Sequence, residues 1–148
     1  MIIWYIEYCI GRYLTKQIYL LANHNGLISS MKIFENIISD RGSKYTVSGR
    51  LVTTRDEIGA TIKLLKKNKK FAKATHNSWA IVFSDLGPIK SDDGEAGAGM
   101  VIVRMLQRKE IHNHLIVVSR WFGGVQLGGD RYRRIRDCVN YYFENYDK

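Results

Sequence analysis

Cysteine and proline are scarce in this chain of 148 residues. The two cysteines, Cys9 and Cys138, lack the spacing of metal ligands, and two thiols do not make a disulfide framework. We therefore expect both to be small apolar groups in reducing surroundings. The single proline, Pro88, and the lack of a serine- or glycine-rich spacer argue against two folded halves joined by a linker. The length is typical of one independently folding domain.

Long uninterrupted apolar runs are also missing. Glu7, Arg12 and Lys16 interrupt the apolar N-terminal stretch too often for a membrane span. The same stretch has no basic leading segment and no small-residue cleavage site, so the sequence predicts no signal peptide. We expect a cytoplasmic protein that does not enter a membrane.

Acidic residues are few relative to basic ones, and the imbalance lies in one part of the chain. Residues 1–40 hold three basic and three acidic side chains, whereas residues 41–148 hold 20 basic and 11 acidic ones. The difference, 20 − 11, accounts for the whole net charge of +9. A basic domain attracts acidic partners such as RNA, the ribosome or an acidic protein surface.

The sequence divides into an extension and a domain. In residues 1–40 the composition favours strands while the apolar spacing favours helices, so we treat them as an extension of uncertain structure. The domain is expected at residues 41–148, where strands and helices alternate. The predicted strands are 45–52, 78–83 and 115–118, a polar loop is predicted at 84–99, and the predicted helices begin at Thr54, at Met100 and at Asp130.

Two helix starts carry capping signals. Thr54 followed by Glu57 is the pattern of a capping box. Asp130 follows the paired glycines at 123–124 and 128–129 and can cap the last helix. The stretch 113–131 thus predicts a buried strand, a glycine-rich loop and a helix N-terminus, where backbone N–H groups can receive an anion or a carboxylate. The alternative is a tight connection whose glycines only permit positive φ.

Two groups of basic side chains stand out. Lys63, Lys66, Lys67 and Lys70 have helical spacing and are predicted to share one face, which is either simply solvated or binds a polyanion. The second group opens the last helix, where cations oppose the helix dipole and therefore need partners. This second group consists of Arg131, Arg133, Arg134 and Arg136. We expect the acidic partners of these arginines to be the residues near Asp92.

Common catalytic and ligand-binding patterns are absent or incomplete. The glycines lack the Lys and Ser/Thr of a phosphate loop and the spacing of a dinucleotide fingerprint. The acids at 92–95 lack the alternation of a calcium loop. His112 and His114 have no third metal ligand nearby in sequence. A hydrolase would need Ser119 and His76 within hydrogen-bond reach, and nothing in their spacing predicts this.

Three separate segments carry a resemblance to a known family. They are residues 74–77 (Ala-Thr-His-Asn), 92–97 (Asp-Asp-Gly-Glu-Ala-Gly) and 117–128, which contains Ser-Arg-Trp-Phe-Gly-Gly. In this order and at these separations the chain resembles the IMPACT family, from about residue 41 to the end of the last helix. Residues 129–131 (Gly-Asp-Arg) are similar to the eukaryotic branch of that family.

The resemblance implies a fold and a site. The implied fold is an α/β (α+β) unit like the second domain of a small-subunit ribosomal protein, a mixed β-sheet with helices on one face. The three segments are implied to line one partner-binding groove, in which an arginine and a tryptophan offer a stacking surface. The implied groove residues are His76, Asn77, Asp92, Asp93, Glu95, Arg120, Trp121, Gly123, Gly124 and Gly128.

The resemblance also implies a function without catalysis or cofactor. Eukaryotic members regulate translation by restraining the amino-acid-starvation kinase that acts on initiation factor 2, compete for its activator, and are associated with actin. Their activator-binding RWD domain is separate, and only residues 1–40 precede the resemblance in this chain. The expected partners are the kinase, its activator or actin, and direct contact with the kinase, actin or RNA is expected ahead of competition for the activator. The alternative is RNA or ribosome binding through a basic face of Lys63, Lys66, Lys67, Lys70, Arg131 and Arg134.

Overall fold

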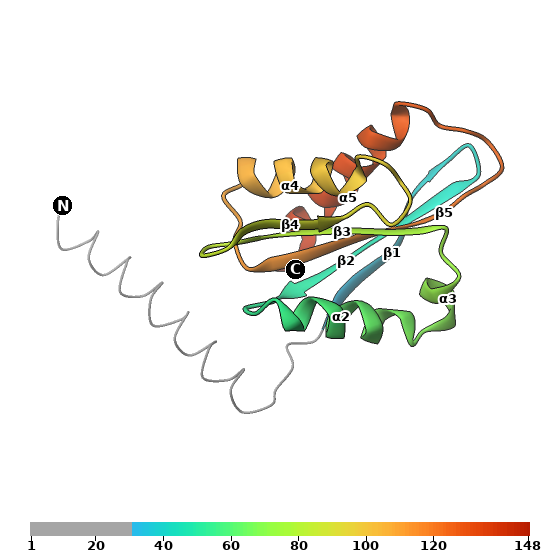
Figure 1. Ribbon diagram of the computed structural model, residues 1–148. Coiled ribbons are helices and arrows are strands. Elements are labelled where there is room, and N and C mark those ends of the chain that lie inside the picture. The colour runs from blue at the N-terminus through green and yellow to red at the C-terminus, as the bar shows by residue number, and fades with distance from the viewer. Residues whose placement is uncertain (1–30) are drawn as a thin grey trace. The chain divides into compact units, whose positions relative to one another are not determined.

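The computed structural model describes residues 31–148, which form one five-stranded sheet and its covering helices (Figure 1). The strand order is β1-β2-β5-β3-β4, and every neighbouring pair is antiparallel. The strands are β1 (Lys32–Asp40), β2 (Ser43–Leu51), β3 (His76–Phe83), β4 (Gly87–Ser91) and β5 (His114–Trp121).

The central strand is β5, as its sequence predicts. Its first seven residues are buried, and it pairs with β2 on one side and β3 on the other. Successive side chains of a strand point to opposite faces of the sheet. Ile116 and Val118 accordingly belong to one hydrophobic core, and Leu115 and Val117 belong to another. The continuous apolar run is thus explained by burial on both faces.

Helices cover both faces of the sheet. α4 (Ala98–Arg108) and α5 (Asp130–Asn145) lie on one face, and α2 (Asp56–Lys66) and α3 (Lys69–Ala72) lie on the other (Figure 1). The α4/α5 face buries residues such as Ile102 and Ile135, and the α2/α3 face buries Ile58 and Phe71. None of the helices within residues 31–148 is long and apolar enough to cross a membrane.

The expected class, a β-sheet packed against helices, is confirmed, and two of its details change. The sheet is antiparallel throughout rather than mixed, and its helices occupy two faces rather than one. The loop prediction for 84–99 is wrong in part, because Gly87–Ser91 form β4. Pro88 fits there because β4 is an edge strand, which does not need every backbone N–H for pairing.

The compact unit begins before residue 41. Strand β1 pairs with β2, so the unit that contains the sheet runs from Met31 to Lys148 rather than from residue 41. Pairing is interrupted between Phe34 and Ile38, where Asn36 has a positive φ of 51° and its N–H donates to Thr46 Oγ1. The remaining signals of the expected extension, and Cys9, lie outside the described residues. Cys138 is a buried free thiol, and burial raises its pKa well above the usual range.

The start of α5 is held by residues of the β1–β2 turn. Asp130 does not cap the helix as predicted, because its carboxylate accepts a 2.6 Å bond from the Arg41 guanidinium. Arg134 pairs with Asp40 at 3.0 Å and not with the acids near Asp92. The hydrogen bonds from Arg41 and Arg134 lower the pKa of Asp40 below its usual value. Of the four arginines expected to have acidic partners, only Arg134 is paired within residues 31–148, and its partners are not the acids near Asp92.

Candidate functional site

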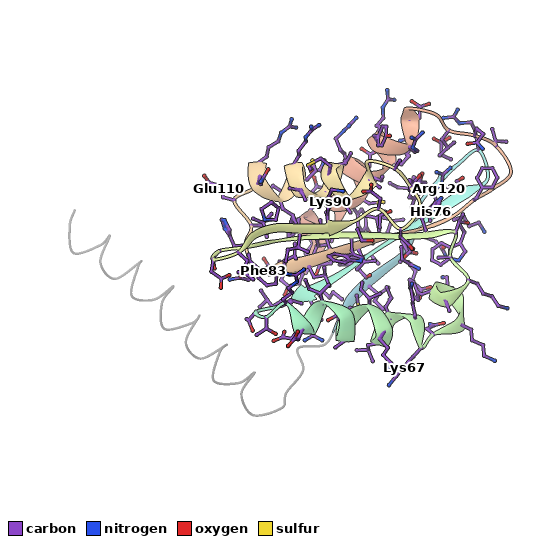
Figure 2. All side chains as sticks on the ribbon, viewed as in Figure 1. Lys67, His76, Phe83, Lys90, Glu110 and Arg120 are labelled. Atoms are coloured by element: carbon purple, nitrogen blue, oxygen red, sulfur yellow. The ribbon has the colours of Figure 1, made fainter. Side chains whose placement is uncertain are left out.

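The segments that carry the family resemblance, here called the signature segments, meet at the end of the sheet where β3 begins and β5 ends. They are residues 74–77, 92–97 and 117–128. His76 of β3 lies opposite Arg120 of β5 in the strand register, and Figure 2 shows both at the same end of the sheet. The Thr75 N–H donates to Arg120 O at 2.8 Å, and the Phe122 N–H donates to Thr75 Oγ1 at 2.9 Å. The convergence implied by the resemblance is therefore present in the fold.

Asn77 lies at the centre of a buried polar network. Its backbone N–H donates to Asp93 Oδ2 at 2.6 Å, and its side-chain amide donates to Phe71 O at 3.0 Å. The Ser119 hydroxyl donates to Asn77 Oδ1 at 2.6 Å. Ser119 is thus buried and bonded to an amide rather than to His76, which removes the nucleophile of the hydrolase hypothesis. His76 Nδ1 lies 2.9 Å from Asp93 O instead.

Asp92 fixes the start of α4. Its two carboxylate oxygens accept the backbone N–H groups of Gly97 at 3.0 Å and Gly99 at 2.8 Å. Burial disfavours the charged carboxylate, but these two hydrogen bonds and the nearby Lys90 outweigh burial and lower the pKa of Asp92. The side chain acts as a remote helix cap, so both oxygens are already engaged.

Arg120 and Glu95 form a buried ion pair between β5 and the turn before α4. Their side chains are only 6% and 4% exposed, and Arg120 Nη1 contacts Glu95 Oε1. Arg120 Nη2 donates to Ser43 Oγ at 3.3 Å, and the guanidinium lies 5.7 Å from the centre of the Tyr45 ring. The expectation that Arg120 offers an open guanidinium to a partner is therefore wrong.

Trp121 points to the opposite face of the sheet from Arg120, because neighbouring strand residues alternate. Its ring packs against Phe71 at 5.7 Å between centroids, and its Nε1–H donates to Lys70 O at 3.2 Å. Lys70 Nζ lies 5.5 Å from the ring centre and pairs with Glu35 at 2.6 Å. The predicted stacking surface of Arg120 with Trp121 is thus not formed.

The signature glycines have different roles. A Cβ on Gly123 would lie 1.9 Å from the carbonyl carbon of Gly42, so only glycine permits this approach of the β5–α5 loop to the β1–β2 turn. Gly124 and Gly128 have positive φ values of 91° and 55°. Both lie in an exposed loop in which an added Cβ would meet no neighbour.

Two exposed apolar side chains in this loop were missed by the sequence reasoning. Phe122 is 44% exposed and Val125 is 47% exposed, whereas the prediction for this loop named only its glycines. Asp93 is exposed and His76 half-buried near the same end of the sheet. An aromatic residue between a signature arginine and a glycine pair was the available signal. These side chains, rather than Arg120 and Trp121, are open to a partner.

The basic face is divided in the structure. Lys63 and Lys66 of α2 and Lys67, which follows its last residue, are exposed, whereas Lys70 pairs with Glu35 as described above. Arg131 lies over the Tyr132 ring at 4.5 Å and donates to Gly128 O. Arg134 is paired with Asp40 and Asp137. Among the six predicted residues, Lys63, Lys66, Lys67 and Arg131 form no ion pair with an acid of residues 31–148.

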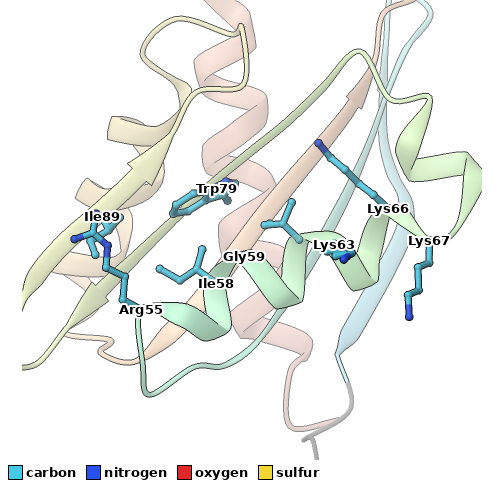
Figure 3. A pocket seen from close by; sticks show the side chains of 9 residues that line it. Arg55, Ile58, Gly59, Lys63, Lys66, Lys67, Trp79 and Ile89 are labelled. Atoms are coloured by element: carbon cyan, nitrogen blue, oxygen red, sulfur yellow. The ribbon is translucent and has the colours of Figure 1, made fainter.

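Those three lysines border a groove between α2 and the β3–β4 hairpin (Figure 3). The groove has a volume of about 730 Å³ and shares no residue with the signature segments. Its lining residues are Arg55, Ile58, Gly59, Ile62, Lys63, Lys66, Lys67, Trp79 and Ile89. No three His, Cys, Asp or Glu side chains within residues 31–148 are grouped so as to hold a metal ion.

Sequence comparison places this chain in a family of known proteins. The Impact N-terminal domain family matches residues 41–143. The chain belongs to the IMPACT family. IMPACT-B of Xenopus tropicalis is 34% identical over 130 residues, covering 84% of this chain and 41% of that protein. Human IMPACT is 35% identical over 107 residues, covering 69% of this chain and 33% of that protein. The chain thus spans well under half the length of these family members.

Solved structures agree with the fold. A protein known only as a hypothetical protein superposes with a TM-score of 0.65 at 18% identity, covering 80% of this chain and 62% of the other. The two-domain translational regulator Yih1 superposes with a TM-score of 0.50 at 28% identity, covering 77% of this chain and 46% of Yih1. The first likeness concerns the fold alone, and the second is to a protein described as a two-domain translational regulator.

Proposed function

We propose that this chain regulates translation by binding other proteins, without catalysing a reaction and without a cofactor. The observation that carries the proposal is the family match across residues 41–143. The likeness to a solved protein described as a translational regulator supports it. The buried network supports a binding role as well, because its polar groups are bonded to one another and its serine lacks a basic partner.

The binding surface in this proposal is the exposed edge of the signature network. Phe122 and Val125 present apolar area there, with His76 and Asp93 nearby as polar neighbours. Aromatic side chains surrounded by polar groups are typical hot spots of protein interfaces. The Arg120–Glu95 pair beneath them holds the loop in place, and a preordered loop loses less conformational entropy on binding.

The partners in this proposal are cytoplasmic proteins of translation control. The starvation kinase acting on initiation factor 2 is the first candidate, and actin is the second.

The test compares the unaltered chain with one double variant and one single control variant in cells deprived of amino acids. Phe122→Ala combined with Val125→Ala removes exposed apolar area from the signature loop. Leu86→Ala is the matched control, because Leu86 is 60% exposed at the distant β3–β4 turn. Expression of the full chain should lower phosphorylation of initiation factor 2, the Phe122/Val125 variant should lose this effect, and the Leu86 variant should keep it. An unchanged phosphorylation level with the unaltered chain refutes the proposal.

RNA or ribosome binding is the second candidate, and one observation favours it. Lys63, Lys66 and Lys67 project from α2 and form no ion pair with any of residues 31–148. Binding to RNA should weaken linearly on logarithmic axes as salt rises, with a slope set by the phosphates contacted. Three lysines imply a slope of roughly −2 to −3. An affinity for RNA too weak to detect at low salt eliminates this candidate.

A further inference from the structure

The groove between α2 and the β3–β4 hairpin combines an apolar floor with a basic border. Ile58 and Ile62 of α2 face Trp79 of β3 and Ile89 of β4, and Figure 3 shows Ile58 directed toward Trp79. Ile58 is buried, but Ile62, Trp79 and Ile89 are only partly buried, so they leave apolar area in contact with water in this open groove of about 730 Å³. Covering that area is favourable, at about 25 cal/mol per Å².

The border of the groove carries charge of one sign. Its charged lining residues are Arg55, Lys63, Lys66 and Lys67, and none of the nine lining residues is acidic. None of these four cations is paired with an acid within residues 31–148. They stand along about 18 Å of helix, the rise expected from residue 55 to residue 67. A ligand that covers the floor therefore meets a positive potential along the whole border.

Gly59 gives an independent indication that the space above α2 is needed. A glycine inside a helix is destabilising relative to alanine. Packing does not require it, because a Cβ on Gly59 would meet no atom within 4 Å. Gly59 nevertheless lies among the residues that line the groove. The helix thus carries an unfavourable residue at the point where it leaves room for a ligand.

From these observations we infer that the groove binds an acidic polypeptide segment that inserts at least one large apolar side chain between Ile62, Trp79 and Ile89. The apolar floor favours polypeptide over RNA. Single-stranded RNA needs several aromatic platforms for its bases, and the floor has one aromatic ring and three isoleucines. Carboxylates of the segment pair with the lysines of α2, and the border accommodates about three helical turns of ligand.

Binding here is separate from the proposed function, since the groove shares no residue with Phe122 and Val125. The assay is fluorescence anisotropy with the full chain and a labelled synthetic peptide of about twelve residues, the helical length that matches the border. The peptide is rich in glutamate and carries two leucines four residues apart. A second peptide replaces both leucines with serine. An oligouridine of equal charge is the nucleic-acid probe.

The expected result has three parts. The leucine peptide binds at least about tenfold more tightly than the serine peptide, because only the leucine peptide buries a large apolar side chain in the groove. Gly59→Phe weakens the leucine peptide at least about tenfold, whereas Ala60→Phe, at the exposed neighbouring position, leaves it unchanged. Lys63→Glu combined with Lys66→Glu abolishes binding, and Lys109→Glu, just after the end of α4 on the other face of the sheet, has little effect.

Several outcomes overturn the inference. Equal affinity for the two peptides would show that charge attracts them without insertion of a side chain. If oligouridine binds more tightly than the leucine peptide and Gly59→Phe removes this binding, the groove binds RNA. A fall in the unfolding midpoint for Gly59→Phe but not for Ala60→Phe means that the chain itself fills the groove. A dimer in sedimentation that Gly59→Phe dissociates means that a second copy does so. Binding unaffected by both Gly59→Phe and the lysine reversals places the peptide elsewhere.

Discussion

Replacing Arg120 with methionine is expected to unfold the protein more easily rather than to remove a partner contact. The guanidinium is 6% exposed and its carboxylate partner, Glu95, is 4% exposed. Methionine leaves the Glu95 carboxylate buried without its counter-charge. Breaking a buried ion pair from one side costs about 3–5 kcal/mol. For a domain of this size, that loss corresponds to a fall of roughly 10 °C or more in the unfolding midpoint.

The second half of the experiment removes both charges. Arg120→Met combined with Glu95→Leu leaves no buried ion, and the neighbouring rings of Tyr45 and Phe122 provide an apolar environment for methionine. Arg120 Nε is buried without a hydrogen-bond partner among residues 31–148, so the change also removes one unsatisfied group. We expect the double variant to recover most of the loss, with a coupling energy of at least about 3 kcal/mol.

Urea unfolding of the full chain, followed by tryptophan fluorescence, measures these free energies, provided that the slope with urea stays constant. Lys70→Met is the matched control, since its pair with Glu35 is 34% and 48% exposed and should contribute less than about 1 kcal/mol. If Arg120→Met lies within about 1 kcal/mol of the unaltered chain and the coupling is near zero, the guanidinium is solvated, and our account of the pair is refuted.

Three further predictions concern stability. Gly123→Ala should cost at least about 2 kcal/mol in urea unfolding, because its Cβ would overlap backbone atoms, whereas Gly129→Ala should be nearly neutral. Burial lowers the pKa of His114 to about 4, so between pH 6.5 and pH 4 the unfolded chain binds a proton that the folded chain does not. The free energy of unfolding should therefore fall as the pH is lowered through this range, by up to about 1.4 kcal/mol per pH unit. His114→Phe should remove that part of the pH dependence. Asp92→Asn should lower the free energy of unfolding by about 1–2 kcal/mol, because it weakens the cap of α4. Most of this difference between variant and unaltered chain should vanish in acid, where the Asp92 carboxylate with its lowered pKa is protonated. Asp147→Asn near the C-terminus should leave the free energy of unfolding nearly unchanged.

Much of the fold is predictable from hydrophobic periodicity. The strand at 115–118 and the helices beginning near Met100 and Asp130 have patterns long or strong enough to identify, and the structure places them in β5, α4 and α5. Strand β4 was missed because it has only five residues and includes Pro88. Its identity as a strand depends on pairing with β3, a contact between segments that local sequence does not report.

The site was predictable as a set of segments but not as a set of exposed side chains. Family resemblance brought residues 74–77, 92–97 and 117–128 together correctly. Arg120 and Trp121 lie on opposite faces of the sheet because neighbouring residues of a strand alternate. Strand β5 is apolar and buried on both faces, so its sequence pattern does not indicate which of the two side chains is buried. Charge partners were equally hidden, because Arg134 pairs with Asp40, which lies before the expected domain boundary.

The buried network limits where a partner can bind. Arg120, Asn77 and Asp92 form hydrogen bonds within the fold, so the signature chiefly identifies the framework that orders the loop after β5. Recognition must then use what the framework leaves exposed, namely the loop with Phe122 and, separately, the α2 groove. If these surfaces act independently, the Phe122/Val125 variant keeps its affinity for the acidic peptide while losing its effect on initiation factor 2. Loss of both activities in that variant, with an unchanged unfolding midpoint, would show that one partner spans both surfaces.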